Sequence, residues 1–248
     1  MSGKTWLKAT ALVLMAVLVL SGCGKKDGTG SSSSGAAASE NNDDSRPVVS
    51  RLSAGDFGYV PNENKDGVII VYMTATASSV VIPDRIDNLP VTGIVTYPML
   101  FYENKNIHSV TFPATVTEIP DESFSGCTGL TEVNMPGVTT IGENAFKGCT
   151  DLKNITMPKV ITIGTSAFEG CINLVKVTLP EGLTTVGDKA FSECINLSDL
   201  SVPASLTQFP FTPSRYVSSS SAFEACFKLP LVVRDKLESQ GYMGFDIW

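Results

Sequence analysis

Cysteines recur at nearly constant spacing in this chain and are the first residues that could do chemistry. Cys127, Cys149, Cys171 and Cys194 are separated by 22, 22 and 23 residues. Such thiols could ligate a metal, form disulfides, act as nucleophiles or only fill a repeated interior. Zinc sites use four ligands at short spacings, whereas these thiols occur once in each repeat. Besides Cys23 the chain has five cysteines, an odd number that cannot all pair in disulfides within one chain. The pattern favours buried free thiols over disulfides, and disulfides over a metal site.

The other reactive residues form no pattern of catalysis. The single histidine, His108, stands beside Ile107 at the start of an expected strand, so we interpret it as a solvated or partly packed side chain. The sequence lacks Gly-x-Ser-x-Gly, a phosphate loop and a dinucleotide fingerprint. We therefore expect no enzyme, no cofactor and no metal. A hydrolase that uses carboxylates in an unrecognised arrangement is the less favoured alternative.

The cysteines belong to a longer repeat that also contains phenylalanine, leucine and proline. Each cysteine lies three residues after a phenylalanine and three before a leucine, as in "AFKGCTDLKNITMP" at residues 145–158. Weaker copies begin at Phe101, with Asn104 in the cysteine position, and at Phe223. This period predicts a leucine-rich-repeat solenoid of about five to six rungs, where a rung is one turn of the solenoid. The anchors are Phe124, Phe146, Phe168 and Phe191, with Leu130, Leu152, Leu174 and Leu197, and with Pro113, Pro136, Pro158, Pro180 and Pro203.

Each rung should consist of short strands joined by a short helical turn. Val133 and Met135 alternate along one expected strand, and Pro136 ends it because proline has no N–H for a neighbouring strand. A second extended piece at 138–141 leads into a helical turn at 143–149. One rung cannot bury its apolar face alone, so neighbouring rungs must stack into a right-handed superhelix of parallel strands and short helical turns, a β/α solenoid.

The repeats "IGENAFKGCTDLKNITMP", "IGTSAFEGCINLVKVTLP" and "VGDKAFSECINLSDLSVP" resemble the BspA-like leucine-rich repeat. The resemblance covers residues 57–242. It implies a surface-displayed bacterial protein that functions in adhesion or protein binding, and it implies no particular ligand. In leucine-rich repeats the cysteine position is filled by Asn or Cys for packing, and Asn104 fits that exchange.

Both ends of the solenoid should be covered, since a terminal rung exposes its core. Residues 49–79 should form an N-terminal β-hairpin from "FGYV" and "GVIIVYM", with Asp66-Gly67 as the turn pair. The repeats should then span residues 80–229. Residues 230–248 should form a C-terminal capping helix and tail, with Val233 and Leu237 on one helix face.

The first 22 residues predict a signal peptide. Two lysines precede the apolar stretch "ATALVLMAVLVL", which is too short for a membrane span. The ending "LSGC" resembles the lipobox of bacterial lipoproteins, and that resemblance makes Cys23 the lipidated first residue of the mature protein. Residues 23–48 should then be a disordered linker rich in Gly and Ser, because they contain no aliphatic residue larger than Ala up to Pro47.

The charge balance restricts the class of partner. The chain has 18 Lys+Arg against 25 Asp+Glu, a net charge of −7. Removing residues 1–22 takes away Lys4 and Lys8 and no acidic residue, which leaves 16 against 25, or −9. This balance argues against nucleic acid and against electrostatic binding to anionic lipid. Contact with the membrane would then be through the lipid on Cys23.

Two surfaces are candidates for contact with a partner. Strand alternation should project two rows of polar side chains, Ser109–Glu132–Asn154–Lys176–Asp199 and Thr111–Asn134–Thr156–Thr178–Ser201. The second surface is a loop about nine residues longer than its counterparts, at 210–222, which contains residue types enriched at protein contacts. The candidate partner-binding residues are Glu132, Asn134, Asn154, Thr156, Lys176, Thr178, Asp199, Phe211, Arg215 and Tyr216. The alternatives are a solvated sheet face and an ordinary variable loop.

These observations together predict a lipid-anchored, extracytoplasmic protein that binds a protein or glycan of the host or of a bacterium at the cell surface. The competing interpretation is a structural surface component without a specific ligand. The sequence favours a monomer.

Overall fold

The structure is a computed structural model of the whole chain, and it describes residues 56–73, 76–95, 100–206 and 221–242. All of them belong to the compact unit Ser50–Trp248. The expected signal peptide, Cys23 and the linker lie outside the described residues. So do Phe211, Arg215 and Tyr216 of the long loop.

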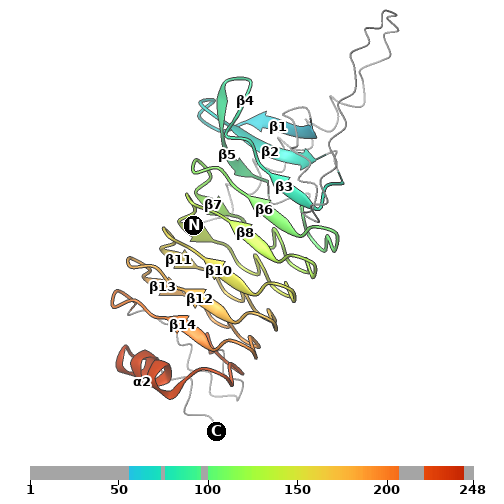
Figure 1. Cartoon of the computed structure of the whole chain (residues 1–248). Coiled ribbons are helices and arrows are strands. Elements are labelled where there is room, and N and C mark those ends of the chain that lie inside the picture. Colours follow the sequence, from blue (N-terminus) through green and yellow to red (C-terminus); the bar gives the residue numbers. More distant parts are fainter. Residues whose placement is uncertain (1–55, 74–75, 96–99, 207–220, 243–248) are drawn as a thin grey trace, which may run out of the picture. The chain divides into compact units, whose positions relative to one another are not determined.

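Parallel strands repeat once per rung along the described solenoid (Figure 1). One side carries the three-residue strands, which pair in register as β3-β6-β8 and β10-β12-β14, with β8 beside β10. The other side carries the two-residue strands, in the order β13-β11-β9-β7. Their bounds are β3 Ser79–Val81, β6 Ser109–Thr111, β8 Glu132–Asn134, β10 Asn154–Thr156, β12 Lys176–Thr178, β14 Asp199–Ser201, β7 Glu118–Ile119, β9 Thr140–Ile141, β11 Thr162–Ile163 and β13 Thr185–Val186. The predicted leucine-rich-repeat solenoid is confirmed.

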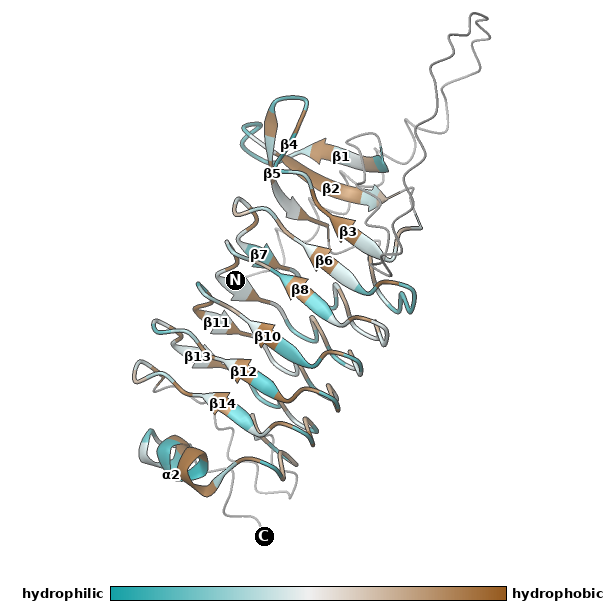
Figure 2. Cartoon of the chain, viewed as in Figure 1, coloured by the Kyte–Doolittle hydropathy of each residue, from teal (hydrophilic) through white to brown (hydrophobic). Residues whose placement is uncertain are grey.

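The three-residue strands follow directly from alternation in the sequence. The central residue of each is aliphatic and buried, as Val133, Ile155 and Val177 are, while its two neighbours face outward. Figure 2 shows this contrast along β8, β10, β12 and β14. An apolar residue flanked by polar ones suits a sheet with one buried and one solvated face.

The expected helical turn takes the form of consecutive hydrogen-bonded turns and not of a regular helix. In one rung the Lys147 N–H donates to the Asn144 carbonyl and the Cys149 N–H to the Phe146 carbonyl. Asn144 and Gly148 have positive φ values of 54° and 70°. A right-handed helix needs negative φ throughout, so these residues end each turn before a helix can form.

The phenylalanines of successive rungs stack into one column at the centre of the core. Phe124, Phe146, Phe168 and Phe191 have ring centroids 5.2, 5.2 and 5.1 Å apart and nearly parallel planes. The column continues to Phe101 at one end and to Phe223 at the other. Parallel rungs place each ring over its own copy, so one sequence position supplies a continuous interior.

A small sheet precedes the solenoid. β1 (Phe57–Pro61) and β2 (Val68–Met73) form an antiparallel hairpin, and β2 pairs with β5 (Leu89–Ile94), which pairs with β4 (Arg85–Ile86). The hairpin lies where the sequence placed it, but its loop is not a tight Asp66-Gly67 turn. The loop spans residues 62–67, because the Asn62 side-chain oxygen accepts the N–H groups of Asp66 and Gly67.

The C-terminal helix α2 (Leu231–Ser239) lies within the segment predicted to be helical. Leu237 is fully buried and Val233 packs against the core, so these two residues share the inward face of the helix. The helix is joined to the preceding rung by Lys236 Nζ, which donates to the Val202 carbonyl, and by Gln240 Nε2, 2.8 Å from the Pro203 carbonyl. Within the described ranges, no helix is long and apolar enough to cross a bilayer.

Candidate interaction surface

The outward side of the three-residue strands brings together seven of the ten predicted partner-binding residues. Strand register places Glu132 beside Ser109, and Asn154 beside Lys176, which in turn lies beside Asp199. The second row has the same register, with Thr156 beside Thr178. We call this the polar sheet face; its members are Ser109, Glu132, Asn154, Lys176 and Asp199, with Thr111, Asn134, Thr156, Thr178 and Ser201. These residues lie on the outward side of the strands, and their role in binding stays a prediction.

The polar sheet face carries few internal contacts of its own side chains. Lys176 Nζ lies 2.8 Å from the Asp199 carboxylate, and both side chains are more than half exposed, so this pair contributes little to stability. At the first rung the Ser79 and Ser109 hydroxyls are 2.6 Å apart. Glu132, Asn154 and Thr156 are exposed. The surface is polar and mixed in charge, which suits hydrogen bonding to a partner better than apolar docking.

The two-residue strands present a second outward face, which the sequence analysis did not single out. The Thr139 hydroxyl donates to the Thr117 carbonyl at 3.1 Å, and the Thr184 hydroxyl donates to the Ile161 carbonyl at 3.2 Å. These hydroxyls bond to the backbone of the preceding rung and are therefore less available to a ligand. The repeated pair of threonines in "VTTI" and "LTTV" was the feature of the sequence that could have predicted this second face.

The repeated thiols form a ladder of weak hydrogen bonds inside the solenoid. All five described cysteines are free and buried, as the sequence predicted. Each Sγ donates to the carbonyl of the phenylalanine in the preceding rung, at 2.8–3.2 Å. The pairs are Cys127–Phe101, Cys149–Phe124, Cys171–Phe146, Cys194–Phe168 and Cys226–Phe191.

Burial keeps these thiols protonated. It raises the pKa of Cys127, Cys171 and Cys226 to about 12, and it raises the pKa of Cys149 and Cys194 well above the ordinary value. The thiolate is the nucleophile and the metal ligand. The ladder is therefore a packing feature, and the repeated cysteines fill the interior of the solenoid.

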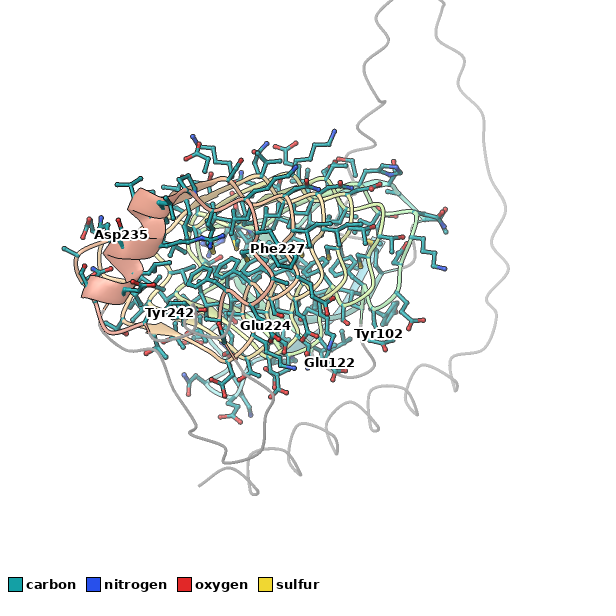
Figure 3. The ribbon with its side chains drawn as sticks, turned by 90° about the horizontal axis from the view of Figure 1, so that it is seen from below. Tyr102, Glu122, Glu224, Phe227, Asp235 and Tyr242 are labelled. Carbon is teal, nitrogen blue, oxygen red and sulfur yellow. The ribbon has the colours of Figure 1, made fainter. Side chains whose placement is uncertain are left out.

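The remaining titratable groups are dispersed over the surface. His108 is exposed, and its Nδ1 lies 2.9 Å from the Asn106 carbonyl. On the turn side of the rungs, Tyr102 lies near Glu103 and Glu122, whose charges raise the pKa of its phenol (Figure 3). Across the described segments, His, Cys, Asp and Glu side chains nowhere gather in threes close enough to hold a metal ion.

The polar sheet face and the stacked interior define a class of protein, the leucine-rich-repeat solenoids. Residues 96–230 match the model of the BspA type leucine-rich repeat region in six copies, and the chain belongs to that family. A comparison with curated proteins gave no significant match.

Solved structures of bacterial leucine-rich-repeat proteins share the fold. A leucine-rich repeat protein of T. pallidum is 26% identical with a TM-score of 0.58, over 78% of this chain and 97% of that chain. A leucine rich cell surface protein of Faecalibacterium prausnitzii A2-165 is 28% identical with a TM-score of 0.59, over 72% of this chain and 53% of that one. A leucine-rich repeat protein of Bacteroides ovatus is 28% identical with a TM-score of 0.58, over 70% and 44%. The chain thus matches only about half of the latter two proteins, and family membership indicates an interaction or structural role.

Proposed function

We propose that this protein is a lipid-anchored, extracytoplasmic binding protein that contacts a protein or glycan at the cell surface through the polar sheet face. The observation that carries the proposal is the contrast within each three-residue strand. The buried central residue is always Val, Ile or Leu from β6 to β14, whereas its outward neighbours include acidic, basic, amide and hydroxyl side chains. Outward variation on a fixed scaffold is how repeat proteins generate binding surfaces.

The electrostatics of the face support a partner that is not strongly charged. Lys176 is already paired with Asp199, and Glu132 adds one negative charge one strand beyond Asn154. The neutral residues between them, Asn154 and Thr156, offer amide and hydroxyl groups on adjacent positions. Nucleic acid would need a basic stripe, and a protein or glycan fits this surface better.

A double substitution tests the face directly. Asn154→Arg with Thr156→Arg places two long cations at the centre of the polar sheet face. Ile161→Arg changes an exposed residue directly before β11, away from that face, and is the matched control. Immobilised wild-type protein would first capture a partner from envelope and host-surface fractions. We expect the double variant to bind that partner at least about tenfold more weakly, as for loss of an interface anchor.

The Ile161→Arg control distinguishes loss of a binding contact from loss of the folded structure. All three substituted positions are exposed, so melting temperatures should stay close to that of the wild type. Equal binding by the double variant and by Ile161→Arg would remove the polar sheet face from the proposal. Failure of the wild type to capture any partner would favour the structural surface component instead.

The membrane anchor is tested separately at Cys23. "LSGC" behind a 12-residue apolar stretch motivates lipidation of this residue, and two or more acyl chains would hold the protein stably. Cys23→Ala should release the protein from the membrane fraction or leave it unprocessed. Continued labelling of that variant with radioactive palmitate would contradict the assignment.

A further inference from the structure

Two exposed apolar groups lie near the C-terminal end of the solenoid. The first is in the turns that precede β12 and β14 and consists of Ile172, Val175 and Ile195, which are 39–41% exposed. The second is at the start of α2 and consists of Leu231 and Val232, which are 75% and 73% exposed. These two are the most exposed large apolar side chains among the described residues. Exposed apolar side chains that gather in one region mark interaction sites.

The first group is bordered by lysines. The Val175 N–H donates to the Lys153 carbonyl at 2.8 Å, which places these two residues side by side in neighbouring rungs. The Asn196 side chain donates to the Ile172 carbonyl at 2.7 Å and accepts from Lys228 Nζ at 2.6 Å. Lys153 Nζ has no hydrogen bond or ion pair with any described residue. We call this surface the apolar-basic edge; its members are Ile172, Val175, Ile195, Lys153 and Lys228.

The exposed side of α2 carries the opposite charge. Leu231, Asp235 and Glu238 follow the i, i+4, i+7 spacing, so they lie on one side of the helix. All three are exposed, and the two carboxylates form no ion pair with any described residue. Figure 3 shows Asp235 on α2. We call this surface the apolar-acidic helix side; its members are Leu231, Val232, Asp235 and Glu238.

The two surfaces are neighbours in one molecule. Lys228, which is bonded to Asn196 of the edge, precedes Leu231 by only three residues. The helix α2 lies beside the rung that contains β14 (Figure 1). A two-fold contact between identical chains puts each surface against the other twice, because residue i meets residue j while j meets i. Aliphatic side chains then meet aliphatic ones and carboxylates meet lysines, so the combined surface is complementary to itself.

Other occupants fit this combined surface less well. An anionic membrane would be repelled by Asp235, by Glu238 and by the net charge of −7. A basic protein would complement the helix side but not Lys153 and Lys228, and an acidic protein would complement only the edge. A second copy of the chain complements both surfaces at once.

We propose that the chain forms a two-fold homodimer in which the apolar-acidic helix side of each copy lies on the apolar-basic edge of the other. The contact covers Leu231 and Val232 with aliphatic residues, and it pairs Asp235 and Glu238 with lysines of the opposite edge. It needs no ligand and is independent of the proposed function of the polar sheet face. It also departs from the monomer that the sequence favours.

Cysteine cross-linking in the producing cells tests the dimer. Two forms of the full chain, one with Ile195→Cys and one with Val232→Cys, are produced in the same cell and treated with a short bismaleimide. Because each chain carries one new thiol, a cross-link between the two forms can arise only between copies. The five repeat thiols are buried and should add little background, which the unsubstituted chain measures. We expect a cross-linked dimer from the two forms together and no more than background from either form alone.

Ile161→Cys produced with Val232→Cys is the matched control, because it puts a thiol at an exposed isoleucine directly before β11. It should give background cross-linking only. Lys153→Glu in both forms should reduce the cross-link between Ile195→Cys and Val232→Cys at least about threefold, because it replaces an attraction by a repulsion. Adding Asp235→Lys should restore part of the loss, which a misfolded chain would not show.

Four results would overturn the proposal. The first is a cross-link of the two forms that is no stronger than that of the control. The second is equal cross-linking of the Val232→Cys form alone, which would place α2 against α2. The third is a cross-link to a different protein, which would make that protein the occupant. The fourth is a cross-link that Lys153→Glu leaves unchanged, since the choice of a second copy depends on the charge pairing.

Discussion

The interior and the polar sheet face of this solenoid obey different rules, although the same rungs build both. Inside, phenylalanine stacks on phenylalanine from Phe101 to Phe223, and each cysteine repeats the same bond to the preceding rung. On the polar sheet face, neighbouring strands present Glu132, Asn154 and Lys176 at one and the same position.

The difference follows from what each side chain meets. A residue inside a stack of parallel rungs contacts its own copy about 5 Å away, so one side-chain shape that packs well is repeated. An outward residue meets water, and a change there costs little. Repetition therefore marks the parts that stabilise the fold, and variation marks the surface on which a specific function can develop.

The strongest test of this contrast compares one substitution in each region. Phe168→Ala removes a fully buried ring with stacked neighbours on both sides, and it should lower the free energy of unfolding by about 3–5 kcal/mol. Thr156→Ala on the polar sheet face should change it by less than about 0.5 kcal/mol. Urea unfolding measures both; similar losses for the two variants would show that the regions do not differ as described.

Substitutions at close backbone contacts between rungs should destabilise the fold almost as much as loss of a core phenylalanine ring. A Cβ added at Gly164 would lie 2.7 Å from the Gly142 carbonyl carbon, whereas one at Gly148 would lie 3.9 Å from its nearest neighbour. Gly164→Ala should therefore cost about 1–3 kcal/mol through overpacking. Gly148→Ala, with φ at +70°, should cost only about 1 kcal/mol from backbone strain. Equal melting temperatures for the two variants would contradict the role of Gly164 in stacking.

The thiol ladder predicts a loss of stability at alkaline pH. Burial raises the pKa of Cys171 in the folded state to about 12, from an ordinary value of 9.0. The unfolded chain then releases protons first, so stability is complete below about pH 8.5 and falls as pH rises toward the folded pKa. Each buried thiol contributes a slope of about 1.4 kcal/mol per pH unit within that window.

Urea unfolding between pH 8 and 10 measures this slope. For Cys171→Ala, the free energy of unfolding should fall less steeply with pH than for the wild type, by the contribution of one thiol. Thr156→Ala on the polar sheet face removes no titratable group and should keep the wild-type slope. A thiol reagent should react slowly with the native described thiols and faster after unfolding. Identical slopes for Cys171→Ala and the wild type would show that the thiol does not titrate as its burial requires.

The sequence predicted the repeated features well because each rung supplies an independent copy of the same pattern. Phe124, Cys127 and Leu130 and their copies defined the rung, and strand alternation placed Glu132 and Asn154 on the outward face. The polar sheet face followed from the same alternation. The identity of a partner could not be predicted in this way, since the outward residues vary from rung to rung and no repeat constrains them.

Features that occur once were harder to predict. The hairpin turn depends on the side chain of Asn62, which bonds to two backbone N–H groups and lengthens the loop beyond Asp66-Gly67. The tight turn lies instead at Asp87-Asn88, between β4 and β5, where both residues have positive φ. In the rungs, the positive φ of Asn144 comes from contact with the next rung, because its N–H donates to the Thr165 carbonyl.

The smallest expected effect concerns a rung position where the repetition is imperfect. The residue before the cysteine is Gly in three successive rungs with φ near +70°, but it is Ala225 with φ of +58° in the last rung. Ala in the left-handed region has a steric strain that Gly avoids. The free energy gained by relieving this strain slightly exceeds the extra conformational entropy that Gly loses on folding. Ala225→Gly should therefore raise the free energy of unfolding by about 0.5 kcal/mol. Ala114→Gly, at an exposed site without positive φ, is the control and should not stabilise. A drop in melting temperature for Ala225→Gly as large as that for the control would mean that strain at this turn is absent.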